Sequence, residues 1–76
     1  MDEMMLVIRG SNTDMDAIHN MVQEKCPYST VKAKNILSDS YELVYQVRVS
    51  QEESTPMIQL LFDLGGVDSV NLLAAQ

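Results

Sequence analysis

The sequence is poor in cysteine, proline, glycine and positive charge. Its 76 residues include one cysteine, two prolines, three glycines and no tryptophan. The single cysteine, Cys26, excludes an internal disulfide and fits a reducing compartment. Five lysines and arginines stand against eleven aspartates and glutamates, giving a formal net charge of −6. Because neutralising phosphates requires clustered cations, we expect neither nucleic-acid binding nor adhesion to an anionic membrane surface.

Long apolar segments are also missing. The longest uninterrupted apolar run, residues 4–8, is far shorter than the ~20 residues that a membrane-spanning helix needs. Residues 1–3 are acidic where a secretory signal peptide would be basic. The chain has the length of one small domain and contains no repeat or linker. We therefore expect a single domain over residues 1–76, located in the cytoplasm.

Hydrophobic periodicity predicts four strands and two helices in the order β-α-β-β-α-β. The strands are expected over residues 4–9, 28–37, 41–50 and 67–74. The first helix is expected to begin after Thr13 as N-cap, with Asp16 three residues later, and to end at about residue 25. The second is expected to begin at Thr55-Pro56 and to run to residue 64.

This order predicts an α+β fold, the ferredoxin-like sandwich, in which two helices cover one face of a four-stranded antiparallel sheet. The first and third strands are central in that arrangement, and Arg9 and Glu42 should then meet on the open face. Lysines 32 and 34 suit an edge strand, which charged side chains protect from unwanted pairing. Tyr41 and Tyr45 fall on the apolar side of their strand.

Three kinds of chemistry known for such folds lack the residues they require. A copper or zinc carrier needs paired cysteines in the first loop, and residues 10–13 contain none. An RNA-binding sheet needs aromatic side chains on its open face, whereas Tyr41 and Tyr45 point to the core. His19 and Cys26 are separated by roughly 10 Å along one helix, too far for a base and a nucleophile to act together. We therefore expect no enzyme, no cofactor and no metal.

The first loop is the candidate ligand site. A helix N-terminus offers free N–H groups and a partial positive charge, which suit a carboxylate or phosphate. The alternative is a plain turn and helix cap, because carboxylates already occupy this end of the helix. A calcium site would need more oxygen ligands than this loop provides. The candidate ligand-binding residues are Gly10, Ser11, Asn12, Thr13 and Asp14.

The second helix is the candidate interface. Its apolar side chains span an arc of about 200°, wider than contact with one sheet requires. Such a surplus predicts a homo-oligomer or an adjacent domain, although a deeply sunken helix would show the same pattern. The candidate interface residues are Met57, Leu61 and Phe62, with Val44 from the third strand.

Two stretches resemble a known family. Residues 41–49, YELVYQVRV, and residues 64–72, LGGVDSVNL, resemble ACT-like regulatory domains, and the likeness covers the whole chain in element order. In particular they resemble the soluble C-terminal domain of bacterial multi-pass membrane proteins, and the cytosolic tail of the MgtC family is similar in plan. This resemblance implies a ligand site near residues 10–14 and a dimer formed through sheet edges or helices.

Together these observations predict a non-catalytic regulatory or assembly domain. We expect it to dimerise and to be the cytosolic part of a bacterial membrane protein, whose adjacent membrane domain is the other expected partner. The alternative is a sensor that binds a small-molecule effector, an amino acid or other anion, at the first loop.

Overall fold

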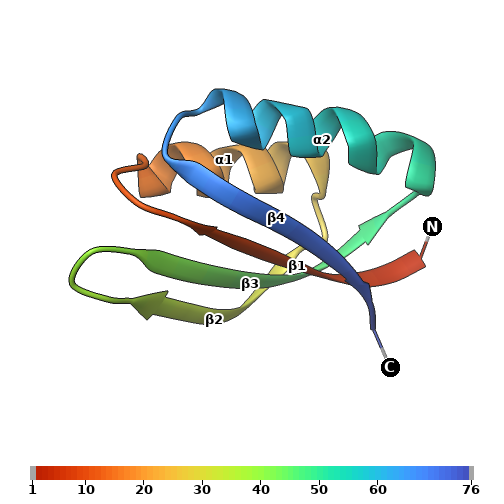
Figure 1. Ribbon diagram of the computed structural model, residues 1–76. Coiled ribbons are helices and arrows are strands. Elements are labelled where there is room, and N and C mark those ends of the chain that lie inside the picture. The colour runs from red at the N-terminus through yellow and green to blue at the C-terminus, as the bar shows by residue number, and fades with distance from the viewer. Residues whose placement is uncertain (1, 76) are drawn as a thin grey trace.

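The computed structural model describes residues 2–75, and its elements follow the predicted order (Figure 1). They are β1 (Asp2–Gly10), α1 (Met15–Lys25), β2 (Thr30–Ile36), β3 (Tyr41–Val49), α2 (Gln51–Asp63) and β4 (Val67–Ala74). Within residues 2–75, no helix is long and apolar enough to cross a bilayer. The α+β ferredoxin-like prediction is confirmed, with β2 shorter by two residues at its start and one at its end.

The four strands form one antiparallel sheet in the order β2-β3-β1-β4. Strands β1 and β3 are central, as predicted, and both helices lie on the same face of the sheet (Figure 1). The register places Arg9 opposite Glu42, and their side chains form an ion pair with an N–O distance of 2.8 Å. The predicted register is therefore confirmed.

The core lies between the sheet and the two helices. Alternate residues of β3 point into it, as the period of two requires, and Tyr41 and Tyr45 are among them. Both helices contribute fully buried side chains that pack against this face. The largest fully buried side chains come from every layer: Leu6, Ile8, Ile18, Val22, Cys26, Val47, Met57 and Leu61.

Helix α1 is capped one residue later than the sequence suggested. The side chain of Asp14 accepts a hydrogen bond from the backbone N–H of Ala17 at 3.2 Å, so Asp14 is the N-cap. Thr13 is engaged elsewhere, because its hydroxyl accepts a hydrogen bond from the Tyr41 hydroxyl at 2.7 Å. The prediction that Thr13 caps the helix is wrong, because its hydroxyl is hydrogen-bonded to Tyr41 of β3 and Asp14 forms the cap instead.

Helix α2 begins four residues before Thr55. Ser50 is the N-cap, and it forms a capping box in which its side chain and that of Glu53 each bind the other's backbone N–H. Pro56 therefore lies inside the helix rather than at its first position. Because proline has no N–H, the carbonyl of Glu52, four residues earlier, loses its hydrogen-bond donor within the helix. Glu52 is exposed near the start of the helix, so water can take the place of that donor. The prediction of a start at Thr55-Pro56 is wrong because the reciprocal cap fixes an earlier one.

Candidate functional site

The first loop borders a hollow at one end of the sheet. The loop between β1 and α1 faces the turn between β2 and β3, and the space between them has a volume of about 430 Å³. Residues 11–13 and Met15 form one wall, and residues 36–41 form the other. Of the five predicted ligand residues, Ser11, Asn12 and Thr13 thus line the hollow.

Gly10 and Asp14 have structural positions instead. A Cβ atom on Gly10 would overlap the carbonyl oxygen of Gly66 and lie 2.6 Å from the Tyr41 hydroxyl. The glycine at position 10 therefore lets the end of β1 pack closely against the turn before β4, and the side chain of Asp14 caps α1.

Hydrogen bonds join the first loop to neighbouring elements. The N–H of Ser11 donates to the carbonyl of Gly66 at 2.8 Å, which ties the loop to the turn before β4. Thr13 accepts from Tyr41 and donates to the carbonyl of Ser11 at 3.3 Å. Asn12 has a φ of 50°, a left-handed conformation that asparagine tolerates better than most residues. These hydrogen bonds connect this wall of the hollow to β3 and to the turn before β4.

The charge around the hollow is negative. Asp39 is in its wall, and no lysine or arginine lines it among the residues that the structure describes. Asp16 adds negative charge in the first turn of α1. A bare anion would find no cation to pair with here, whereas a ligand that carries an ammonium group would find a carboxylate.

The four predicted interface residues do not form one surface. Met57 and Leu61 are 1% and 0% exposed and belong to the domain's own core, which leaves them no surface for a partner. The expectation is wrong for these two because the wide apolar arc of α2 includes its core-facing side. Phe62 is exposed on α2, while Val44 is half-buried on the open face of the sheet, away from the helices.

Polar networks occupy much of that open face. Two clusters of hydrogen-bonded side chains cross it, Arg9–Glu42–Asn35 and Arg48–Glu3–Gln46. Hydrogen bonds from Gln46 and Arg48 hold the pKa of Glu3 below its usual value. Val44 lies between these clusters. The open face is therefore mainly polar, as expected of a sheet face in contact with solvent rather than of an apolar interface.

An apolar surface that the sequence analysis missed lies at β2. Seven large hydrophobic side chains are exposed among residues 2–75, and four of them lie on or beside this edge strand: Tyr28, Val31, Ile36 and Leu37. The signal in the sequence is the weak alternation of residues 28–37, which leaves apolar side chains on a strand that no helix covers. The other three are Leu60, Phe62 and Leu73.

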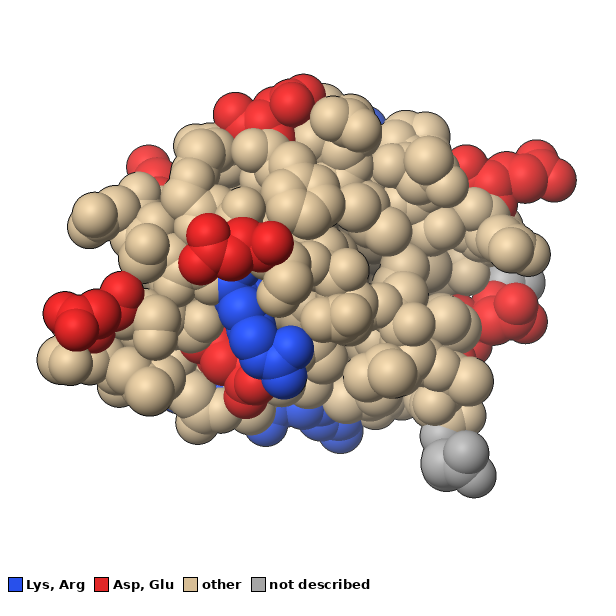
Figure 2. Space-filling model, viewed as in Figure 1, with Lys and Arg blue, Asp and Glu red and all other residues tan. Residues whose placement is uncertain are grey.

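The described residues show no assembled reactive centre. No group of three or more histidine, cysteine or acidic side chains among residues 2–75 is placed to hold a metal ion. Burial raises the pKa of the Cys26 thiol, whose sulfur lies 3.7 Å from that of Met57, and this lowers the fraction of reactive thiolate. His19 stacks on the ring of Tyr45 with a centroid separation of 6.4 Å. On the face shown in Figure 2, acidic side chains outnumber basic ones.

Comparison with known proteins defines the fold. No sequence-family model and no curated protein matches the chain. Its structure is similar to the ACT domain from the GTP pyrophosphokinase of Chlorobium tepidum, with a TM-score of 0.71 and 15% identity over 95% of this chain and 97% of that one. The protein thus has the ACT-like fold that the sequence resemblance implied.

A second solved structure gives the more particular likeness. The C-terminal domain of the MgtC protein from Mycobacterium tuberculosis superimposes with a TM-score of 0.75 and 11% identity, over 99% of this chain and 88% of that one. The resemblance to the MgtC tail, first drawn from strand and turn motifs, is therefore supported in three dimensions. At these identities the likeness concerns the fold.

Proposed function

We propose that this chain is a non-catalytic regulatory or assembly domain that works by associating with a second copy of itself. The observation that carries the proposal is the exposure of seven large hydrophobic side chains among residues 2–75, in a domain whose core is already closed. A chain of this size buries only about 60% of its unfolded surface, so it gains more than a large domain does from covering such side chains. Both structural neighbours are domains of larger proteins, which agrees with a regulatory role.

Sedimentation velocity tests the association directly. We expect a monomer–dimer equilibrium between 1 and 100 μM, on the order of the affinity of transient interfaces between domains. A single monomeric species throughout this range, with the apolar side chains free in solution, would contradict the proposal.

The parent of this domain is proposed to be a bacterial membrane protein, with the domain on its cytoplasmic side. The likeness to the C-terminal domain of MgtC supports this context. The test is the complete gene: a reading frame that encodes hydrophobic helices of about 20 residues next to this domain is the expected result. A complete gene that encodes this domain alone would refute the membrane context and leave self-association untouched.

A second candidate function, an amino-acid sensor, is favoured by the hollow beside the first loop. Asp39 would hold the ammonium group, and Ser11 and Asn12 lie on the opposite wall. A thermal-shift screen of the twenty amino acids should find one that raises the melting temperature, because a ligand that binds only the folded state stabilises it. The Asp39→Asn variant should abolish that shift, and a screen in which no amino acid raises the melting temperature would exclude the sensor.

A further inference from the structure

An apolar groove lies between α2 and the edge strand β4, on the helix side of the sheet. Ile58 of α2, Met4 of β1 and Leu72 of β4 line it, and its volume is about 410 Å³. Phe62 follows Ile58 by four residues on the same face of α2 and is 40% exposed, so it extends the apolar wall. Val70 precedes Leu72 by two residues on the same face of β4, and both are half-buried at the margin of the core. This surface, the α2–β4 groove, is therefore an apolar strip that the domain itself leaves partly uncovered.

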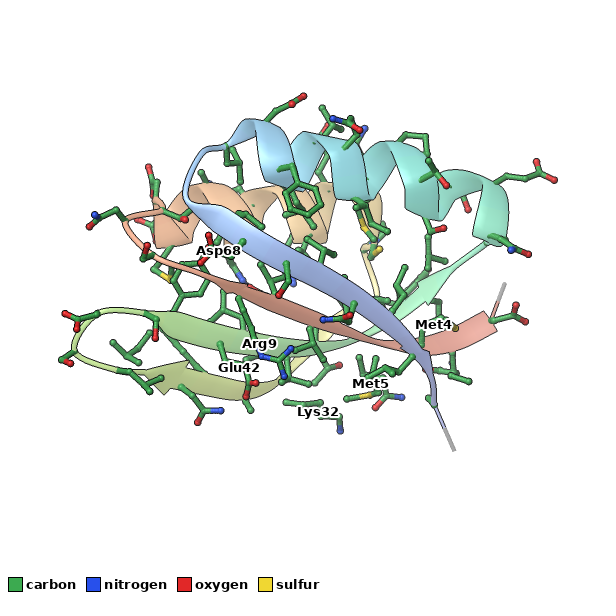
Figure 3. The ribbon with its side chains drawn as sticks, in the orientation of Figure 1. Met4, Met5, Arg9, Lys32, Glu42 and Asp68 are labelled. Carbon is green, nitrogen blue, oxygen red and sulfur yellow. The ribbon has the colours of Figure 1, made fainter. Side chains whose placement is uncertain are left out.

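The charge around the α2–β4 groove has one sign. Residues 49–75, which include α2 and β4, contain four acidic residues and neither lysine nor arginine. Asp2 lines the groove, and no basic side chain does so among the residues that the structure describes. Arg9 and Lys32 lie on the other side of the sheet, away from the helices (Figure 3). An apolar strip with acidic surroundings is therefore suited to a partner that is both apolar and basic.

This charge decides between the candidate occupants of the groove. The cytoplasmic surface of a bilayer is anionic, so the acidic residues would repel it. A second copy of the chain would bring the same acidic residues against these, and like charges that face each other across an interface reduce affinity. An amphipathic helix with a basic side meets both requirements, because its apolar stripe can enter the groove while its lysines and arginines lie near carboxylates.

We infer that the α2–β4 groove binds a basic amphipathic helix from the membrane domain of the parent protein. This inference rests on the proposed membrane context and names the kind of segment that the domain contacts. The cytoplasmic loops of membrane proteins carry an excess of lysine and arginine, so such a parent would present basic segments close to this domain. Apolar side chains of the helix pack against Ile58, Phe62 and Leu72, and a basic side chain lies near Asp2. Because part of the attraction is between exposed charges, salt weakens the contact.

A peptide titration tests the chemistry of the partner. The probe is a synthetic peptide of about 15 residues, built from leucine and lysine so that the leucines form one stripe of a helix. Fluorescence anisotropy of the labelled peptide should show saturable binding with a Kd on the order of 10 μM. An isomer of the same composition, with its leucines spread around the helix, should bind about tenfold more weakly, because it has no apolar stripe. Equal binding of the two peptides, or no saturable binding below about 1 mM, would overturn the inference.

Two substitutions on α2 test the position of the site. Phe62→Lys removes an apolar side chain from the groove and places a positive charge there. Leu60→Lys is the matched control, because it makes the same change of charge at a residue 37% exposed and about 200° further around the helix. We expect Phe62→Lys to weaken peptide binding about tenfold and Leu60→Lys by less than about twofold, since only the first opposes a cation to the bound helix. Circular dichroism confirms that both variants are folded, and equal weakening by the two would overturn the site, because it would show attraction to the acidic domain as a whole.

Two further measurements separate this inference from its alternatives. Vesicles that contain phosphatidylglycerol should not bind the domain, and binding to them in preference to the peptide would overturn the choice of occupant. The proposed self-association is measured by sedimentation without peptide, and the proposed membrane parent is tested by the complete gene. A groove that does not bind the peptide would therefore overturn this inference and leave both of those proposals standing.

Discussion

Among single residues, Gly10 and Gly66 allow the end of β1 and the first loop to lie in close contact with the turn before β4. A Cβ atom on Gly66 would overlap the carbonyl oxygen of Ser11 and lie 2.6 Å from the Thr13 hydroxyl oxygen. Gly66 also has a φ of +81°, which L-residues rarely adopt. The glycines therefore explain the shape of the first loop without any ligand. Sequence reasoning assigned Gly10 to a ligand site because a glycine before a helix N-terminus allows close approach of a ligand. The contact with Gly66 spans most of the chain and leaves no local signal in the sequence.

The first prediction concerns Gly10→Ala. The added methyl group should destabilise the fold by about 1–3 kcal/mol, because the atom that it overlaps most, the carbonyl oxygen of Gly66, is backbone and cannot rotate away. Gly65→Ala is the matched control: the space there is open and only its φ of +84° is unfavourable, so about 1 kcal/mol is expected. Urea unfolding measures both changes, and an effect of Gly10→Ala no larger than that of Gly65→Ala would contradict the steric account.

The second prediction concerns Cys26. Its side chain is 1% exposed, and burial raises the pKa of its thiol above the ordinary value. Iodoacetamide should therefore label the native protein at pH 8 very slowly, and labelling should become fast once urea unfolds the chain, because the thiolate is the reactive form. Rapid labelling of the native protein would show that this end of α1 opens.

At the level of elements, the strands were easier to predict than the helix ends. The alternation of apolar and polar residues in β3 fixed both its position and its buried face, and the pairing of Arg9 with Glu42 followed from it. For α2, the prediction rested on Thr55-Pro56 alone and overlooked Ser50 and Glu53, which form the actual cap. Propensity alone does not separate the two patterns, because both are common at helix starts.

The third prediction concerns the cap of α2. Ser50→Ala removes the hydroxyl that accepts from the backbone of Glu53 and should cost about 1 kcal/mol in the free energy of unfolding. Thr55→Ala is the control and should cost less, because Thr55 is an exposed residue within the helix. Chemical denaturation of the two variants separates the capping-box start from the start at Thr55; a larger effect for Thr55→Ala would contradict it.

The same cap makes a fourth prediction about pH. Hydrogen bonds from the Ser50 hydroxyl and backbone lower the pKa of Glu53 in the folded state. A depressed carboxyl pKa stabilises the fold above the unfolded pKa, and this contribution is lost as the pH falls through the folded pKa. The stability of the wild type should therefore decline more steeply with acidification below about pH 4.5 than that of Ser50→Ala. Equal slopes in urea midpoints between pH 5 and 3 would contradict the role of the cap.

At the level of the whole molecule, the fold could be predicted and the position of the exposed apolar side chains could not. The order of elements and the right-handed crossovers determine the ferredoxin-like sandwich. Which apolar residues stay exposed depends on how far the helices extend over the sheet. Of the interface candidates on α2, Met57 and Leu61 lie in the core and Phe62 lies on the surface. The exposed side chains of β2 were not predicted.

Small-angle X-ray scattering of the purified chain tests the self-association of this domain most directly, because it reports mass and shape together. A dimer should give twice the 8.5 kDa of one chain and a radius of gyration well above the 11.4 Å of the single domain. Scattering at about 100 μM that yields the mass and radius of one chain would contradict the account, since association of this kind should be populated at such concentrations.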